Sequence, residues 1–233
     1  MRRRRRAPGL RRGETDGVAA LTTIYQRLLK RFGPQYWWPA QSPFEMMVGA
    51  ILTQATNWRN VERAVDGLRR AGALKPQALL ALRGDRLERL VHPTGYFRQK
   101  ATRLRVFTRW FMSRFGGNPA RMFREPHEGL RRELLAVDGV GQETADSILL
   151  YAGAKPVFVV DAYTMRVLRR HRLSGARATY EQVQRFITDA LPQDPALYNE
   201  FHALLVAVGK HFCHRRSPDC TRCPLGELPH TSR

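Results

Sequence analysis

A glycine turn and a lone aspartate are the parts of this chain whose residue types and spacing could do chemistry. Gly139 and Gly141 follow the apolar segment 134–137 and free the backbone for a tight turn. A second helix is expected to begin near Gln142, and its first backbone amides have no partner inside that helix. Those amides and the positive end of the helix dipole form an anion site suited to a phosphate. An ordinary turn between two helices is the alternative interpretation.

Asp161 is the first candidate for a catalytic group. It follows the apolar run 157–160 and precedes a helix expected to start at Ala162. A carboxylate in this place can cap the helix by accepting amide hydrogen bonds. It can also stabilise the positive charge that develops when a bond to a sugar breaks, and it can orient an attacking water. The capping role and the catalytic role are compatible.

Helices must position both groups, because apolar residues recur with helical spacing along almost the whole chain. Glycine, proline and asparagine signals mark the breaks between helices. No alternating strand pattern of useful length appears, and the run 157–160 is short enough to be a buried connector. The sequence therefore predicts an all-α protein without internal repeats. The expected helices cover residues 18–32, 43–55, 58–71, 76–82, 84–91, 97–115, 127–137, 142–153, 162–171, 179–191 and 195–211.

The charge balance points to a polyanionic partner. The chain has 40 Lys plus Arg residues against 20 Asp plus Glu, a formal net charge of +20, and a pI near 11.2. Seven arginines lie in the first twelve residues, and the remaining 33 basic residues still exceed the 20 acidic ones by 13. Counterion release drives such chains onto nucleic acid. A membrane surface is the competing anion, but no basic amphipathic helix with an aromatic face stands out.

The N-terminal arm, residues 1–16, is expected to be a disordered basic tether. It lacks the apolar core of a signal peptide, and no apolar run approaches the roughly 18 residues that a membrane span needs. We therefore expect a soluble intracellular protein, cytoplasmic or associated with the nucleoid, although composition leaves a transit peptide open. A chain of 233 residues can bury one or two compact cores.

The order of these features resembles that of the HhH-GPD DNA glycosylases, and specifically their endonuclease III branch. Gly-Val-Gly before a helix, followed by Val-Val-Asp, is similar to their helix-hairpin-helix and catalytic aspartate. The match runs from about Tyr36 to Cys223. By this resemblance, Gly139, Val140, Gly141 and Gln142 would contact DNA.

The resemblance also implies a two-lobed fold. One lobe would be a six-helix barrel over residues 42–155, which includes the hairpin. The other would be discontinuous, with residues 17–41 plus 156–233, and would carry a metal-cluster loop. The hairpin and Asp161 would face the cleft between the lobes, where the DNA would lie.

Glu143 is the most consequential departure from the branch. The bifunctional members carry a lysine at this position, and that lysine attacks the sugar as an amine nucleophile. A carboxylate cannot form the resulting Schiff base, so strand-nicking lyase chemistry is not expected. Glu143 can serve as a second catalytic acid or base, or simply as a favourable acid in the first turn of a helix.

The lysine-free pattern resembles the 3-methyladenine glycosylases of the endonuclease III type. A base alkylated on a ring nitrogen is cationic, so its glycosidic bond is already weak and recognition can depend on stacking. Trp37, Trp38 and Trp58, with Tyr36, would offer electron-rich faces to a flipped purine. The alternative is that these tryptophans fill the protein core.

Three further residues match positions of the family that contact DNA. Gln54 would fill the hole that the flipped base leaves, and Tyr96, after Gly95, would be a second wedge. Lys210 matches a basic position near the aspartate. A polar residue at a helix end, a loop anchor and a solvated lysine are the respective alternatives.

The C-terminal tail contains all three cysteines, Cys213, Cys220 and Cys223, and this clustering suggests a metal rather than a disulfide. The family's four-iron cluster loop starts with the same spacing. The expected fourth cysteine is absent, and its place falls at Pro229, beside His230. His230 could supply a nitrogen ligand, and Asp219 or Glu227 could supply an oxygen. A 4Fe-4S cluster is the first hypothesis, a zinc site with three cysteines and His230 the second, and an empty site the third.

These features predict a monofunctional DNA glycosylase that acts as a monomer on double-stranded DNA containing a damaged base. It would remove an alkylated purine such as 3-methyladenine by water attack assisted by Asp161. One alternative is an endonuclease III-like glycosylase for oxidised pyrimidines with weak or absent AP-lyase activity. Another is a non-catalytic DNA-binding protein that keeps the hairpin grip.

Overall fold

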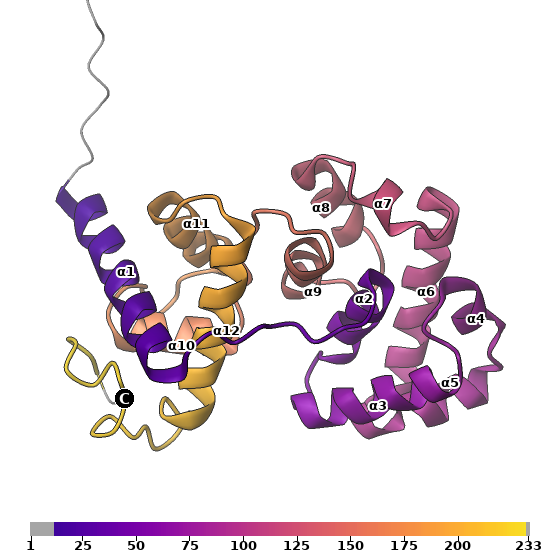
Figure 1. Cartoon of the computed structure of the whole chain (residues 1–233), viewed down its shortest axis with the longest axis horizontal. Helices are drawn as coiled ribbons and strands as arrows, with labels where there is room; N and C mark the ends of the chain where they lie inside the picture. The colour runs from indigo at the N-terminus through magenta and orange to yellow at the C-terminus, as the bar shows by residue number, and fades with distance from the viewer. Residues whose placement is uncertain (1–11, 232–233) are drawn as a thin grey trace, which may run out of the picture. The chain divides into compact units, whose positions relative to one another are not determined.

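The structure, a computed structural model, describes residues 12–231, with side chains described from residue 17 onward. Its regular secondary structure in that range is entirely helical, which confirms the predicted all-α fold (Figure 1). No helix within residues 12–231 combines the length and apolar character that crossing a bilayer requires. The α-helices are α1 (Arg12–Phe32), α2 (Pro43–Leu52), α3 (Trp58–Arg70), α4 (Pro76–Ala81), α5 (Gly84–Val91), α6 (Phe97–Phe115), α7 (Pro119–Met122), α8 (His127–Leu135), α9 (Gln142–Ser147), α10 (Ala162–Arg170), α11 (Tyr180–Ala190) and α12 (Pro195–His211).

The chain forms two compact units. Unit 1 combines Met1–Gln35, Val160–Gln193 and Glu200–Arg233, and unit 2 combines Tyr36–Val159 with Asp194–Asn199. The first eleven residues, which hold most of the N-terminal arginines, lie outside the described residues. Helix α1 begins at Arg12, inside the segment 1–16 that the sequence predicts to be disordered.

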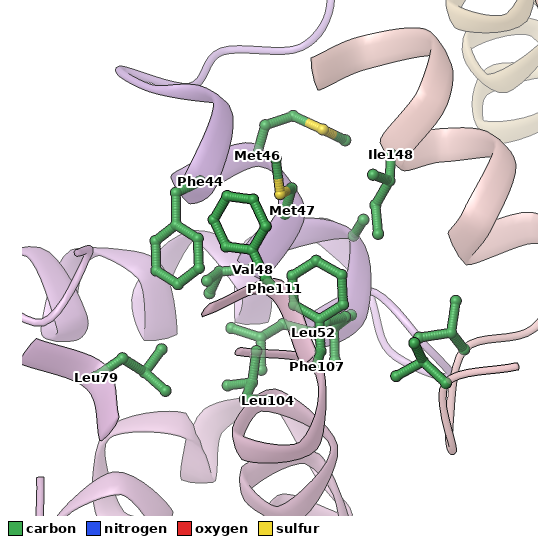
Figure 2. Close-up of a cluster of buried hydrophobic side chains, with 14 of the residues drawn as sticks. Phe44, Met46, Met47, Val48, Leu52, Leu79, Leu104, Phe107, Phe111 and Ile148 are labelled. Carbon is green, nitrogen blue, oxygen red and sulfur yellow. The ribbon is translucent and has the colours of Figure 1, made fainter. Parts of the chain in front are cut away.

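A buried aromatic and aliphatic core organises unit 2. Every residue from Phe44 to Leu52 in α2 is buried, and α2 packs against α3, α6 and α9. The rings of Phe44 and Phe111 stack with centroids 5.9 Å apart, and Phe107 stacks on Phe111 at 6.2 Å (Figure 2). Burying a helix on all sides removes a large apolar area from water, so α2 is a fixed base for the segments that follow it.

Two details of unit 2 differ from the helices expected from sequence. The helix expected over 142–153 is an α-helix only to Ser147 and continues as a π-helical turn, η2 (Ile148–Ala152). The four-residue helix α7 is not predicted from the sequence, because about one turn is too short to display the spacing of apolar residues typical of a helix. Its start is set locally: the Asn118 side chain accepts from the amides of Ala120 and Arg121.

Unit 1 is built from α1, α10, α11 and most of α12. In α1, Leu21, Ile24 and Leu28 are buried at helical spacing, and α1 packs against α11. The C-terminal segment is joined to α10 where the Thr231 amide donates to the Arg170 carbonyl at 2.8 Å. The run 157–160 forms no strand and is buried, as the sequence predicts.

Candidate functional site

The glycine turn in unit 2 connects α8 to α9 and requires its first glycine. Gly139 has φ +82°, which favours glycine, and an added Cβ would lie 2.4 Å from Cγ of Arg103. The turn therefore rests directly on the aliphatic part of the Arg103 side chain. Gly141 is the N-cap of α9, and no side chain caps the helix there.

Gln54 uses both ends of its carboxamide, one toward the same turn and the other toward Arg103. Its Nε2 donates to the Gly139 carbonyl and to Oγ1 of Thr144, each at 2.9 Å. Its Oε1 accepts from Nη1 of Arg103 at 2.5 Å. The carboxamide thus joins three segments of unit 2, and the insertion of Gln54 into DNA stays a prediction.

A buried ion pair joins the two helices of the hairpin. Nε and Nη2 of Arg131 in α8 lie 2.6 and 3.0 Å from the two carboxylate oxygens of Asp146 in α9. Asp146 is fully buried, and the bidentate geometry compensates its charge. The sequence analysis does not predict this pair. The only sign of it in the sequence is that Asp146 is an acidic residue among apolar ones. Glu143, in the first turn of α9, is exposed.

The loop between the 3-10 turn η1 (His92–Thr94) and α6 presents Tyr96. Tyr96 is 70% exposed and adopts φ +44°, directly after Gly95 at φ +68°. Beneath this loop, Lys100 is buried, and its Nζ donates to the carbonyls of Leu52 at 3.0 Å and Thr94 at 2.7 Å. Burial lowers the pKa of Lys100 to about 8. The sequence alone assigns no role to Lys100.

The three predicted stacking residues form one aromatic cluster in unit 2. The ring centroids of Trp58 lie 4.8 Å from Trp37 and 4.7 Å from Trp38, and Trp37 and Trp38 lie 5.2 Å apart. Tyr151 extends the cluster, 5.4 Å from Trp38. All three tryptophans are partly exposed. The structure thus brings together residues that are twenty positions apart in the sequence.

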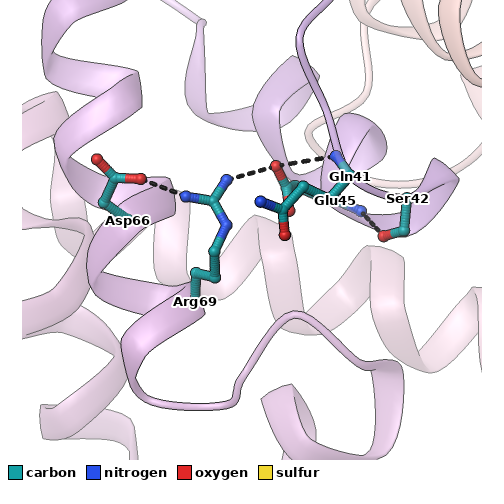
Figure 3. A network of polar contacts seen from close by, with 5 residues as sticks. All are labelled: Gln41, Ser42, Glu45, Asp66 and Arg69. Atoms are coloured by element: carbon teal, nitrogen blue, oxygen red, sulfur yellow. Dashed lines mark hydrogen bonds and ion pairs between the residues drawn. The ribbon is translucent and has the colours of Figure 1, made fainter.

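A polar pocket borders this cluster. Trp38 and Trp58 line it together with charged residues of α2 and α3. Among these, Glu45 is buried and pairs with Nη2 of Arg69 at 2.7 Å, and Arg69 also pairs with Asp66 (Figure 3). Nε1 of Trp58 donates to Glu62 at 2.7 Å. These contacts involve four of the six charged side chains that line the pocket, and Arg59 and Arg63 are the other two.

Asp161 lies in unit 1 and caps α10. Its Oδ1 accepts from the Thr164 amide at 2.7 Å, which confirms the predicted N-cap. Its side chain is 12% exposed, and Oδ2 lies 3.8 Å from Nε2 of the buried His202. Burial lowers the pKa of His202, and the charge of Asp161 opposes this effect. Lys210 is exposed in the last turn of α12.

The three cysteines of unit 1 line a single opening, which also borders His230. All three are free thiols, and Nη1 of the buried Arg170 lies 3.1 Å from Sγ of Cys213. Burial raises the pKa of the Cys223 thiol. In the described part of the chain, no three His, Cys, Asp or Glu side chains are grouped closely enough to hold one metal ion.

Comparison with known proteins gives consistent matches over most of the chain. Residues 48–193 match the HhH-GPD superfamily of base excision DNA repair proteins. A Methanocaldococcus jannaschii protein named as a DNA repair glycosylase is 42% identical over 207 residues, which cover 88% of this chain and 93% of that protein.

Solved structures agree with this match. The crystal structure of H. pylori 3-methyladenine DNA glycosylase bound to 1,N6-ethenoadenine has a TM-score of 0.72 and 27% identity, covering 83% of this chain and 97% of that one. A non-covalent complex of endonuclease III with DNA has a TM-score of 0.79 at 21% identity, covering 91% and 94%. At that identity, the second likeness concerns the fold alone.

Proposed function

Because the chain belongs to the HhH-GPD superfamily of base excision DNA repair proteins and is a DNA glycosylase, we propose that it removes alkylated purines such as 3-methyladenine. The observation that carries this proposal is the packed cluster of Trp37, Trp38 and Trp58. Electron-rich ring faces attract a cationic base more than a neutral one. The similarity to the H. pylori 3-methyladenine glycosylase supports the same substrate class.

The proposed reaction needs little acid catalysis. The bond between C1′ and the base nitrogen breaks, and its electron pair neutralises the alkylated base as it leaves. The deoxyribose becomes oxocarbenium-like, and the carboxylate of Asp161 stabilises that positive charge. Water then adds to C1′ and gives its proton to Asp161. Since Thr164 holds Oδ1, we assign this role to Oδ2.

We assign the DNA grip to the hairpin turn and the Tyr96 loop. Backbone amides at Gly139 to Gln142 would bind a phosphate of the damaged strand. Gln54 would fill the hole that the flipped base leaves, and the exposed ring of Tyr96 would be a second wedge; together they would offset part of the unstacking cost of a few kcal/mol. Lys210 would contribute a further cation to the phosphate backbone.

Strand cleavage is not part of the proposed activity. Glu143 stands in the first turn of α9, where the bifunctional relatives carry the attacking lysine. A carboxylate lacks the amine that forms a Schiff base with the opened sugar. The product would therefore be an intact strand with an abasic site.

We propose a structural 4Fe-4S cluster held by Cys213, Cys220 and Cys223 with His230 as the fourth ligand. Support comes from the four side chains lining one opening and from the Arg170 guanidinium, whose Nη1 lies 3.1 Å from Sγ of Cys213. Such a cluster would tie the C-terminal loop to α10 and α12.

A panel of duplexes, each with one defined lesion, tests the substrate. We expect release of free 3-methyladenine, with the strand intact until the abasic site is cleaved by alkali. Release of thymine glycol alone would replace the proposal with an oxidised-pyrimidine enzyme. Tight binding without release of any base, unchanged in Asp161→Asn, would indicate a binding protein.

A further inference from the structure

Two inward-pointing cations on consecutive turns of α6 join the segments that the proposed function assigns to DNA. Lys100 and Arg103 are three positions apart, so they lie on one face of the helix. We propose that both are positioning residues, which hold the Tyr96 loop and the hairpin turn at a fixed separation, with Arg103 acting through Gln54. This inference rests on the proposed function for the DNA contacts and on unit 2 alone for its geometry.

Arg103 supports the hairpin turn in two ways. Its aliphatic part lies directly under Gly139, where an added Cβ would be 2.4 Å from Cγ. Its guanidinium donates to Oε1 of Gln54, and this fixes which end of the carboxamide faces the turn. The amide nitrogen of Gln54 is then directed at the Gly139 carbonyl and at Thr144. The orientation of Gln54 therefore depends on Arg103.

Lys100 supports the Tyr96 loop. Its amine donates to the carbonyl of Leu52, two residues before Gln54, and to the carbonyl of Thr94, two residues before Tyr96. The Leu52 carbonyl belongs to the last turn of α2, where helix carbonyls lack intrahelical partners. One buried amine thus fixes both the end of α2 and the loop that exposes Tyr96.

The hydrogen bonds of Lys100 and those of Gln54 meet at the end of α2. Lys100 holds α2 to the Tyr96 loop, and Gln54, just beyond α2, holds it to the hairpin. The Tyr96 ring and the hairpin amides can contact the same nucleotide only if the distance between them is already correct before DNA binds. Small misplacements lower both reaction rate and affinity. In this arrangement, Arg103 and Gln54 position the turn, and Lys100 positions the loop that presents Tyr96.

A double-mutant cycle tests whether Arg103 positions the hairpin turn through Gln54. The probe is a duplex with one tetrahydrofuran abasic analogue, and the readout is its Kd. We expect Arg103→Met and Gln54→Leu each to weaken binding roughly tenfold, since each removes a hydrogen bond that orients the turn. If Arg103 acts through Gln54, the double variant binds no more weakly than either single variant. If the fold-changes in Kd of the two single variants multiply in the double variant, Arg103 contacts DNA independently of Gln54, and the proposal is overturned.

Matched variants control for charge and for folding. Arg109 is exposed on the same helix, so the effect of Arg109→Met should multiply with that of Gln54→Leu. Arg103→Lys keeps a donor for Gln54 and should recover most of the affinity. Urea denaturation of each variant identifies any that are simply unfolded, and the cycle is then repeated with Arg103→Gln.

For the positioning role of Lys100, the readout is insertion of the Tyr96 ring into the duplex. A 2-aminopurine opposite the tetrahydrofuran reports unstacking by its fluorescence. We expect Lys100→Met to lower the fluorescence rise at saturating protein while binding to undamaged duplex stays within about twofold. An unchanged rise would overturn the assignment. None of these measurements needs base release, so failure to find a substrate leaves them interpretable.

Discussion

The carboxylate of Asp161 accepts the backbone N–H of Thr164 at 2.7 Å, so the residue assigned to catalysis also starts α10. The hydrogen bond fixes the side-chain rotation, and it occupies only one of the two oxygens. Stability and activity are therefore separable at this position, because an amide can replace the carboxylate as a cap but not as a charge.

Asp161→Asn should fold normally and lose catalysis. We expect its melting temperature to match that of the unchanged protein, whereas Asp161→Ala should lose about 1 kcal/mol of stability with the cap. Single-turnover base release should fall roughly 10²- to 10⁴-fold in both variants. A normal rate in Asp161→Asn would remove this residue from the mechanism.

Borohydride trapping tests the role of position 143. We expect no covalent adduct between the unchanged protein and a duplex containing an abasic site, because Glu143 cannot form a Schiff base. Glu143→Lys places an amine in the exposed first turn of α9 and should yield a trapped adduct on denaturing gels. Glu143→Gln is the matched control without an amine. An adduct with the unchanged protein would restore lyase chemistry.

The buried pair Arg131–Asp146 should carry much of the stability of the hairpin. Arg131→Met removes the bidentate partner of the fully buried Asp146 carboxylate, and we expect a loss of about 3–5 kcal/mol in the free energy of unfolding. Arg89→Met removes an exposed pair with Asp85 and should cost far less, because water screens exposed charges. Urea denaturation measures both values, and equal losses would contradict the argument.

The metal proposal is tested without reference to activity. We expect the purified protein to contain iron and inorganic sulfide and to be brown, and Cys220→Ser to lose that colour. His230→Ala should lower the iron content, with Pro229→Ala as a neighbouring control. Stoichiometric zinc in colourless protein would favour three cysteines and His230 as a zinc site. Absence of any metal would mean that the opening is empty.

Lys100 predicts a specific pH dependence of stability. Its pKa is about 8 in the folded protein, because burial disfavours the charged amine, and 10.5 is its ordinary value. Below pH 8, both folded and unfolded chains hold the proton, so the burial cost is constant. Between pH 8 and 10.5, only the unfolded chain holds it, so the free energy of unfolding rises with pH. This rise should disappear in Lys100→Met and persist in Lys30→Met, whose parent side chain is exposed.

Much of the secondary structure could be predicted from the sequence, because it depends on residues only a few positions apart. The helices expected over 84–91, 97–115 and 195–211 match α5, α6 and α12 residue for residue, because apolar period, glycine and proline act within a few positions. The turn at Gly139 and the cap at Asp161 are local for the same reason. By contrast, the π-helical turn at Ile148–Ala152 follows no apolar period of its own and was missed.

Only the tertiary structure decided which polar groups meet. Gln54 and Arg103 are 49 positions apart, Lys100 and Leu52 are 48 apart, and no spacing rule connects them. Residue type says that a buried lysine needs acceptors but not which carbonyls will provide them. Sequence thus determined the segments that could touch DNA, whereas packing of α2 against α6 decided how those segments are held together.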